Sequence, residues 1–147
     1  MSKPYPIAYY FAYGSNISSV QMRTRCPDAI FNGIGYLKEY DFLINERGVA
    51  TIIPREGSIV YGVVWEVSPK DIESLDIYEG VRQGLYARKN DICINIKTKK
   101  ILAFIYVADN QEIGAPRHGY LEKIIDNACI LGFDSNYVDK LKKWMPE

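Results

Sequence analysis

One acidic residue occupies a position that a helix does not favour. The stretch SLDIYEGVRQGLY (residues 74–86) has the pattern of a helix that ends in a turn, and Glu79 lies at that end, between Tyr78 and Gly80. The C-terminus of a helix carries partial negative charge, so an acid is not expected there. Either Glu79 is solvated and tolerated, or its position serves chemistry. Beside apolar and tyrosyl side chains its pKa would rise, which suits a general acid or base near neutral pH.

A second candidate lies near the start of the chain. YYFAYGSN (residues 9–16) runs from apolar and aromatic residues directly into Gly14-Ser15-Asn16, which predicts a buried strand that ends in a tight turn. Consecutive backbone N–H groups at a helix entrance favour an anion such as a substrate carboxylate, and Gly14 can adopt a conformation closed to other residues. A plain corner between two elements uses the same residues, so both interpretations stay open at this point.

Two further groups are weaker candidates. Ser15 has the residue type of a nucleophile and His118 is the single histidine, but AYGSN does not match the G-x-S-x-G turn that presents a hydrolase serine. A lone histidine in a turn-rich stretch is more commonly a surface residue. Arg82 and Arg88 could pair with an acid such as Glu79 or with a ligand, although arginines at such spacings usually face solvent.

Strand patterns dominate the first two thirds of the chain and helix patterns the last third. Runs rich in β-branched and aromatic residues predict the strands, with a polar turn between the last two. They cover residues 7–13, 30–37, 39–45, 49–53, 58–67, 86–96 and 99–108.

Helix boundaries come from capping residues. Ser68-Pro69-Lys70-Asp71 predicts a helix start, with Ser68 as the cap, Pro69 in the first position and Asp71 in the first turn. Three other helices are expected. They are a short one capped by Asn16 or Ser18 and ending before Pro27, one over 120–131 that stops at Gly132, and one near 135–144 capped by Asp134 or Ser135.

The order of these elements indicates the fold class. Strands follow one another in runs and do not alternate with helices, which argues against a doubly wound sheet. We therefore predict an α+β fold in which six or seven mostly antiparallel strands form a small mixed barrel with helices packed against it. No repeat or linker interrupts the 147 residues, so we assign one domain over residues 1–147.

Composition excludes several classes of function. The 18 basic and 18 acidic side chains cancel, so nucleic acid and anionic membrane surfaces are not expected partners. No apolar run approaches the roughly 18 residues that a membrane helix needs. Cys26, Cys93 and Cys129 form no CxxC pair, and one histidine is too few for common zinc patterns. We expect reduced cysteines, no metal and a cytoplasmic location.

Five motifs together resemble the gamma-glutamylcyclotransferase family. They occur in order and at compatible spacings over nearly the whole chain. They are FAYGSN (11–16), VATI (49–52), YGVVWEV (61–67), LDIYEGVRQGLY (75–86) and APRHGY (115–120). The resemblance implies a compact mixed barrel and cyclising cleavage of a γ-glutamyl amide. In that reaction the substrate's own α-amine attacks its γ-carbonyl and releases 5-oxoproline and an amino acid or amine, with no cofactor or metal.

The resemblance also implies roles for individual residues. Glu79 matches the family's acid/base glutamate, and one carboxyl can take the proton of the attacking amine and return it to the leaving nitrogen. Tyr106 is further expected to orient Glu79. The residues that match the family's substrate-binding positions are Tyr13, Gly14, Ser15, Asn16, Tyr86, Tyr106 and Tyr120.

Some features are left open by the resemblance. Residues 109–119 are expected to cover the pocket and to select the leaving group. The γ-glutamyl-amino-acid branch ranks above the glutathione-specific branch, and a γ-glutamylamine branch stays open. A non-catalytic module that binds γ-glutamyl or carboxylate ligands is the alternative function. The expected partner is a small-molecule γ-glutamyl substrate, without nucleic acid or membrane, and a homodimer is left open.

Overall fold

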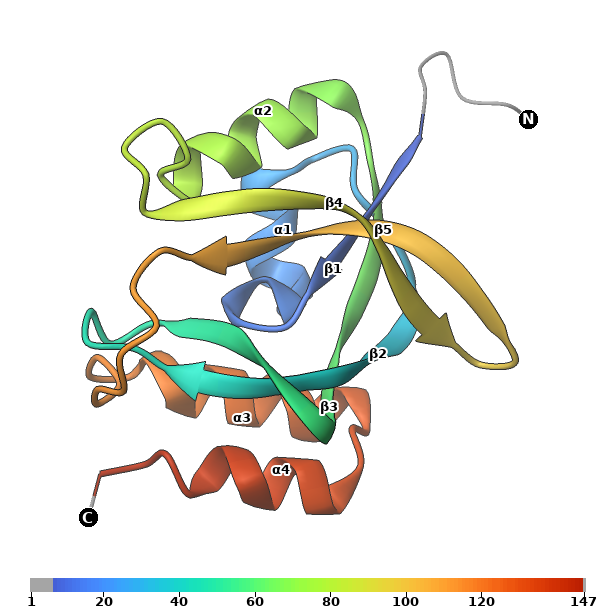
Figure 1. Ribbon diagram of the computed structural model, residues 1–147. Coiled ribbons are helices and arrows are strands. Elements are labelled where there is room, and N and C mark those ends of the chain that lie inside the picture. The colour runs from blue at the N-terminus through green and yellow to red at the C-terminus, as the bar shows by residue number, and fades with distance from the viewer. Residues whose placement is uncertain (1–6, 147) are drawn as a thin grey trace.

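The protein forms a small β-barrel with helices on its outside (Figure 1). The computed structural model describes residues 7–146, and in that range five strands close the barrel in the order β1-β3-β2-β4-β5. Neighbouring strands are antiparallel except β1 and β5, which are parallel. The strands are β1 (Ala8–Ala12), β2 (Ile30–Ile44), β3 (Ala50–Val67), β4 (Tyr86–Ile96) and β5 (Lys99–Ala108). The predicted α+β barrel is therefore confirmed, while residues 1–6 and 147 of the predicted single domain lie outside the described range.

The predicted number of strands was wrong, because two pairs of predicted strands are continuous. Residues 30–37 and 39–44 belong to β2, and residues 50–53 and 58–67 belong to β3, so Asn45 and Val49 lie just outside the two strands. The β2–β3 register shifts between Lys38 and Tyr40, where Glu39 has φ of 69°. This is an irregularity of the bulge type, which bends a strand without ending it.

The helices begin and end at the residues that the capping patterns indicate. They are the 3₁₀ helix η1 (Ser15–Ile17), α1 (Ser19–Arg25), α2 (Pro69–Tyr78), α3 (Tyr120–Leu131) and α4 (Ser135–Lys142). Ser68 and Asp71 form a reciprocal capping box at the start of α2. Gly132 ends α3 in the left-handed conformation with φ of 79°, which glycine adopts at low cost. The last helix stops at Lys142, two residues before the predicted end.

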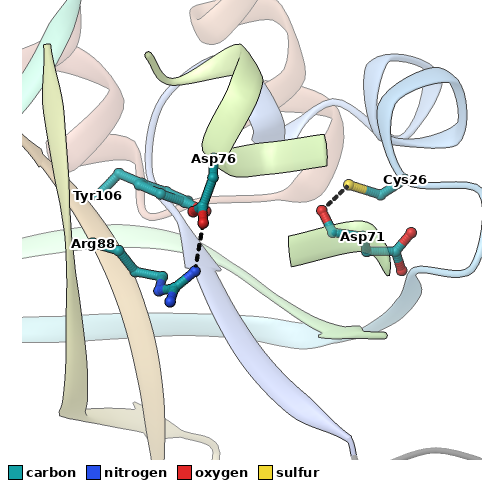
Figure 2. A network of polar contacts seen from close by, with 5 residues as sticks. All are labelled: Cys26, Asp71, Asp76, Arg88 and Tyr106. Carbon is teal, nitrogen blue, oxygen red and sulfur yellow. Dashed lines mark hydrogen bonds and ion pairs between the residues drawn. The ribbon is translucent and has the colours of Figure 1, made fainter. Parts of the chain in front are cut away.

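The helices pack on different sides of the barrel. In Figure 1, α3 and α4 run beside β2 and β3, and the rings of Tyr61 in β3 and Tyr137 in α4 have centroids 5.1 Å apart. The N-terminal half of α2 is tied to the end of α1, where the Cys26 thiol donates a hydrogen bond to the Asp71 carbonyl at 3.7 Å (Figure 2). The C-terminal half of α2 is tied to β4 and β5 through Asp76.

Side chains from all strands fill the barrel. Phe11, Ile44, Ile52 and Ile94 are completely buried, and they come from four different strands. Burial of each such side chain contributes about 1.5–3 kcal/mol. The barrel is thus a rigid frame for the turns at its ends. None of the helices in residues 7–146 has the length and apolar character to cross a membrane.

Candidate active site

A cavity of about 500 Å³ lies where several chain segments meet. Its walls come from the turn after β1, the end of α2, the start of β4, the loop after β2 and the first turn of α3. This volume suits a small organic ligand. The structure brings every predicted site residue to this one cavity: Tyr13, Gly14, Ser15, Asn16, Glu79, Tyr86, Tyr106 and Tyr120.

Glu79 is the acidic side chain of the cavity wall. It is the C-cap of α2, and its backbone N–H donates to the Leu75 carbonyl at 2.8 Å. Burial raises the pKa of the Glu79 carboxyl to about 7, and the nearby Arg25 guanidinium acts in the opposite direction. The rise agrees with the expectation for a carboxyl placed among apolar and tyrosyl side chains. Glu79 is thus divided between its two protonation states near neutral pH.

Tyrosine side chains surround Glu79. The Tyr86 hydroxyl donates to the Ala50 carbonyl at 2.5 Å, and the Tyr120 hydroxyl accepts from the Ala50 N–H at 3.0 Å. Burial raises the pKa of Tyr13, of Tyr86 and, to about 12, of Tyr120, and the charge of Glu79 adds to each rise. These phenols are therefore neutral at physiological pH and can donate hydrogen bonds.

No hydrogen bond joins Tyr106 and Glu79 in the described residues. The Tyr106 hydroxyl donates to Asp76 at 2.7 Å, and the Tyr106 carbonyl accepts a hydrogen bond from the Tyr13 hydroxyl at 2.5 Å. The expectation that Tyr106 helps to orient Glu79 therefore stays a prediction. Arg88 also pairs with Asp76, at 2.7 Å, while Arg82 is exposed outside the cavity wall.

The turn after β1 presents backbone to the cavity. In the 3₁₀ helix, the recorded hydrogen bonds use the N–H groups of Ile17 and Ser18, so within the described chain those of Ser15 and Asn16 have no internal acceptor. The Gly14 backbone has φ of −110° and ψ of −134°, which lies outside the left-handed region. A Cβ at Gly14 would lie 3.5 Å from the Tyr120 hydroxyl, on the cavity side.

Asn16 holds this turn in place. Its side chain is buried, donates to the Tyr10 hydroxyl at 3.0 Å and accepts from Gln21 at 2.8 Å and from Arg25 at 3.0 Å. Its carbonyl accepts from the Trp65 indole at 3.0 Å. The Asn16 side chain is thus fully engaged within the protein.

The serine and histidine of the weaker interpretation do not form a pair. Ser15 and His118 both line the cavity, but the Ser15 hydroxyl accepts a hydrogen bond from Gln21 at 2.8 Å. No Ser15–His118 hydrogen bond occurs in the described part of the chain. The arrangement of a nucleophile activated by a base is therefore not present here.

Sequence reasoning missed the basic residues of the cavity. Arg25, Arg47, Arg117 and Lys123 line it, and Glu79 is the one acidic residue among the described lining residues. The whole chain has zero net charge, so the cavity is a local cationic region on a neutral protein. Arg117 lies in the APRHGY motif and in the expected covering segment 109–119, whereas Arg25, Arg47 and Lys123 belong to no motif that the sequence analysis used.

Two loops, one with Arg47 and Gly48 and one with Arg117, are tied together at the cavity. We call the three cations Arg47, Arg117 and Lys123 the basic mouth. The Arg117 Nε donates to the Arg47 carbonyl at 2.8 Å, and its N–H donates to the Gly48 carbonyl at 3.0 Å. Gly48 has φ of 80°, and a Cβ there would lie 2.7 Å from the Arg117 Cγ, so a larger residue would push the loops apart. Of the expected covering segment 109–119, the last three residues line the cavity.

The chemistry of the wall is that of proton transfer and anion binding. In residues 7–146, no group of three His, Cys, Asp or Glu side chains is placed to hold a metal ion. This small barrel protein has a site with one carboxyl of pKa about 7, neutral phenols, backbone N–H groups without an internal acceptor and several cations. Such a site suits a polar, anionic small molecule.

Comparison with known proteins identifies the family of this chain. The profile of the AIG2-like family matches residues 59–141. Gamma-glutamylcyclotransferases of mouse and human are 35% and 32% identical to this chain, over 93% of its length and 78% of theirs. A solved structure named gamma-glutamyl cyclotransferase has a TM-score of 0.88 at 29% identity, over 97% of this chain and 90% of that one. The chain belongs to the gamma-glutamylcyclotransferase family, which confirms the family and the enzyme class predicted from the motifs.

Proposed function

We propose that this protein cleaves γ-glutamyl amides by internal cyclisation and that Glu79 is the general acid and base. The observation that carries the proposal is the Glu79 carboxyl, with a pKa of about 7, in the wall of a cavity of about 500 Å³. A carboxyl with a pKa near the working pH is effective both in accepting and in returning a proton.

The reaction needs one proton to move twice. The substrate's α-amine nitrogen attacks the γ-carbonyl carbon, and Glu79 takes a proton from that nitrogen. The bond between the γ-carbon and the amide nitrogen then breaks, and Glu79 returns the proton to the leaving nitrogen. The products are 5-oxoproline and a free amine, with no change in oxidation state. Because the nucleophile is tethered to the electrophile, positioning supplies much of the acceleration.

The glutamyl end of the substrate fits the turn after β1. The N–H groups of Ser15 and Asn16 have no internal acceptor in the described structure, and Arg25 lies beside Asn16. These groups would bind the α-carboxylate or the developing oxyanion. The neutral phenols of Tyr86 and Tyr120 then complete the wall around Glu79.

The leaving end of the substrate fits the basic mouth. Arg47, Arg117 and Lys123 line that part of the cavity. A leaving amino acid carries a carboxylate and a leaving amine does not, so the cations favour γ-glutamyl amino acids over γ-glutamylamines.

We place the protein in the cytoplasm, because its three cysteines are free. We also propose that its partner is a small-molecule substrate and that the protein forms a homodimer.

The test is to incubate the protein with γ-glutamyl dipeptides and γ-glutamylamines and to measure 5-oxoproline. Glu79→Gln keeps the shape of the side chain and removes the proton carrier, so kcat should fall by about 10²–10⁴-fold. Glu73→Gln, on an exposed position of the same helix, is the matched control and should retain full activity. Binding of γ-glutamyl compounds by the wild type without any 5-oxoproline would support the non-catalytic binding module instead.

A further inference from the structure

Asp76 lies one helical turn before Glu79 and has a partner for each carboxylate oxygen. Its Oδ1 accepts a hydrogen bond from the Tyr106 hydroxyl at 2.7 Å, and its Oδ2 forms an ion pair with Arg88 at 2.7 Å. Figure 2 shows Asp76 on α2 with both partners reaching it from the neighbouring sheet. Asp76 therefore joins the helix that carries Glu79 to the barrel.

The two partners come from adjacent strands. Arg88 in β4 and Tyr106 in β5 are directly opposite one another in the β4–β5 register. The Arg88 guanidinium also lies 5.9 Å from the centre of the Phe104 ring, two residues from Tyr106 on the same strand. One carboxylate thus contacts both strands at a single register position.

Tyr106 extends this connection to the cavity. Its ring is 2% exposed and packs edge-on against Tyr10, with centroids 5.7 Å apart. Its carbonyl accepts the hydrogen bond from the Tyr13 hydroxyl, at the start of the turn that carries the free N–H groups. The hydrogen bond between Asp76 and Tyr106 therefore connects the end of α2, through Tyr106, to Tyr13 at the start of the turn after β1.

Few other side-chain contacts hold the end of α2, and one of them is the Arg25 guanidinium, which lies 4.4 Å from the centre of the Tyr78 ring. Leu75 is fully buried, but Ile77 and Tyr78 are 78% and 55% exposed, so the last turn buries little apolar surface. The Val81 N–H donates to the Asp76 carbonyl at 3.0 Å, so the chain around Glu79 folds back onto Asp76. A helix end with few apolar contacts depends on polar ties for its position.

We propose that Asp76 is a positioning residue, which holds the Tyr106 hydroxyl and the last turn of α2 so that Glu79 faces the substrate. Asp76 does not line the cavity, whereas Tyr106 and Glu79 do, and both Asp76 oxygens are already in use. The role is therefore one of support and not of proton transfer. It rests on the proposed function, because the reaction that it serves is the one assigned above.

The experiment compares four variants in the full-length protein. Asp76→Ala removes both ties, Asp76→Asn keeps an acceptor for Tyr106 and loses the charge, and Tyr106→Phe removes the donor. Asp41→Ala is the matched control, because Asp41 also pairs with an arginine, Arg55 at 3.1 Å, but lies outside this cavity.

We expect Asp76→Ala to lower kcat by about 10- to 100-fold, the size of a small misplacement of catalytic groups. KM should change little, Asp76→Asn should recover most of the activity, and Asp41→Ala should match the wild type. Tyr106→Phe should resemble Asp76→Ala, and the double variant should be slower than Asp76→Ala by no more than about twofold.

Two results would overturn the proposal. If Asp76→Ala had the kcat of Asp41→Ala, no positioning role would exist. If Asp76→Asn were as slow as Asp76→Ala while still folded, the hydrogen bond from Tyr106 would not be what positions Glu79, and the proposal would fail.

A second measurement does not need turnover. Carbon-13 NMR titration of the Glu79 carboxyl, assigned with Glu79→Gln, should give a lower pKa in Asp76→Ala than in the wild type, because the released helix end admits water. An unchanged Glu79 pKa in Asp76→Ala would contradict the proposal. Absence of 5-oxoproline production by the wild type would instead contradict the proposed function, and the titration would still decide the role of Asp76.

Discussion

The Arg25 guanidinium lines the same cavity as the Glu79 carboxyl and holds the pKa of that carboxyl below the value that burial alone would give it. The two charges are carried by different helices, α1 and α2, that meet at one end of the barrel. Burial is the larger influence, so the pKa of Glu79 still rises to about 7. The pKa of Glu79 thus results from two opposing effects, desolvation by burial and the positive charge of Arg25.

Replacement of Arg25 should shift the titration of Glu79. Arg25→Met removes the cation, so the pKa of Glu79 should rise above about 7 and the acid limb of kcat/KM should move to higher pH. Besides the cations and His118 of the cavity wall, neutral phenols lie near Glu79, on β1 or directly after it, on β4 and on α3. They belong to Tyr10, Tyr13, Tyr86 and Tyr120.

Arg23→Met is the control for this change, because Arg23 lies exposed on the same helix outside the cavity. Carbon-13 NMR of the substrate-free protein gives the Glu79 titration independently of catalysis. A Glu79 pKa in Arg25→Met equal to or below that of the wild type would show that the two charges do not interact.

The Glu79 carboxylate should lower the free energy of unfolding at alkaline pH. Its folded pKa of about 7 lies above the ordinary value of 4.5, so the folded state binds the proton more tightly than the unfolded state. The contribution to stability is therefore fully present below about pH 4.5 and is lost as pH rises through 7. At pH 8, Glu79→Gln should raise the free energy of unfolding by about 1–3 kcal/mol, with little change at pH 4.

Urea unfolding at pH 4, 6 and 8 measures this difference. The exposed Glu73→Gln variant should follow the wild type at each pH. If Glu79→Gln were equally stable or less stable at pH 8, the carboxyl would not be desolvated in the folded protein.

Arg117 should distinguish leaving groups. Its guanidinium lies at the basic mouth, and its Nε is held by the Arg47 carbonyl at 2.8 Å. Arg117→Met should raise KM for a γ-glutamyl amino acid by about 5- to 30-fold, since a charged hydrogen bond contributes about 1–2 kcal/mol in an open site. KM for a γ-glutamylamine, which lacks the second carboxylate, should stay close to the wild-type value.

Arg82→Met is the control for charge alone, because Arg82 is exposed outside the cavity wall. If Arg117→Met raised KM equally for both substrates, Arg117 would support the structure of the basic mouth and would not bind the leaving group.

Replacement of Ser15 and replacement of Asn16 should have different effects on turnover and stability, although the two residues are adjacent. Ser15→Ala loses one hydrogen bond from Gln21 and should retain most of its turnover, because the proposed reaction needs no hydroxyl nucleophile. Asn16→Ala leaves its buried partners unpaired and should lower the free energy of unfolding by about 2–4 kcal/mol. Activity assays with urea unfolding of both variants test this contrast. Loss of all turnover in a stable, substrate-binding Ser15→Ala variant would revive the nucleophile interpretation.

Local sequence determined the element ends and the position of Glu79. The capping box of Ser68 and Asp71 and the stop at Gly132 depend on residues within one helical turn, so their patterns can be read without the fold. Glu79 lies at the end of α2 for the same reason. The strand that leads into Ser15 and Asn16 is also a local pattern, and the motifs of the family carried the rest of the candidate site.

Only the tertiary structure decided which side chains meet. The Tyr106 hydroxyl donates to Asp76 and not to Glu79, and the β4–β5 register places Arg88 and Tyr106 together beside the C-terminal half of α2. The continuity of β2 through Glu39 likewise depends on pairing with β3, which the polar residues there do not reveal. The basic mouth joins residues far apart in the chain, and such contacts are set by closure of the barrel, a property of the whole fold and of no single segment.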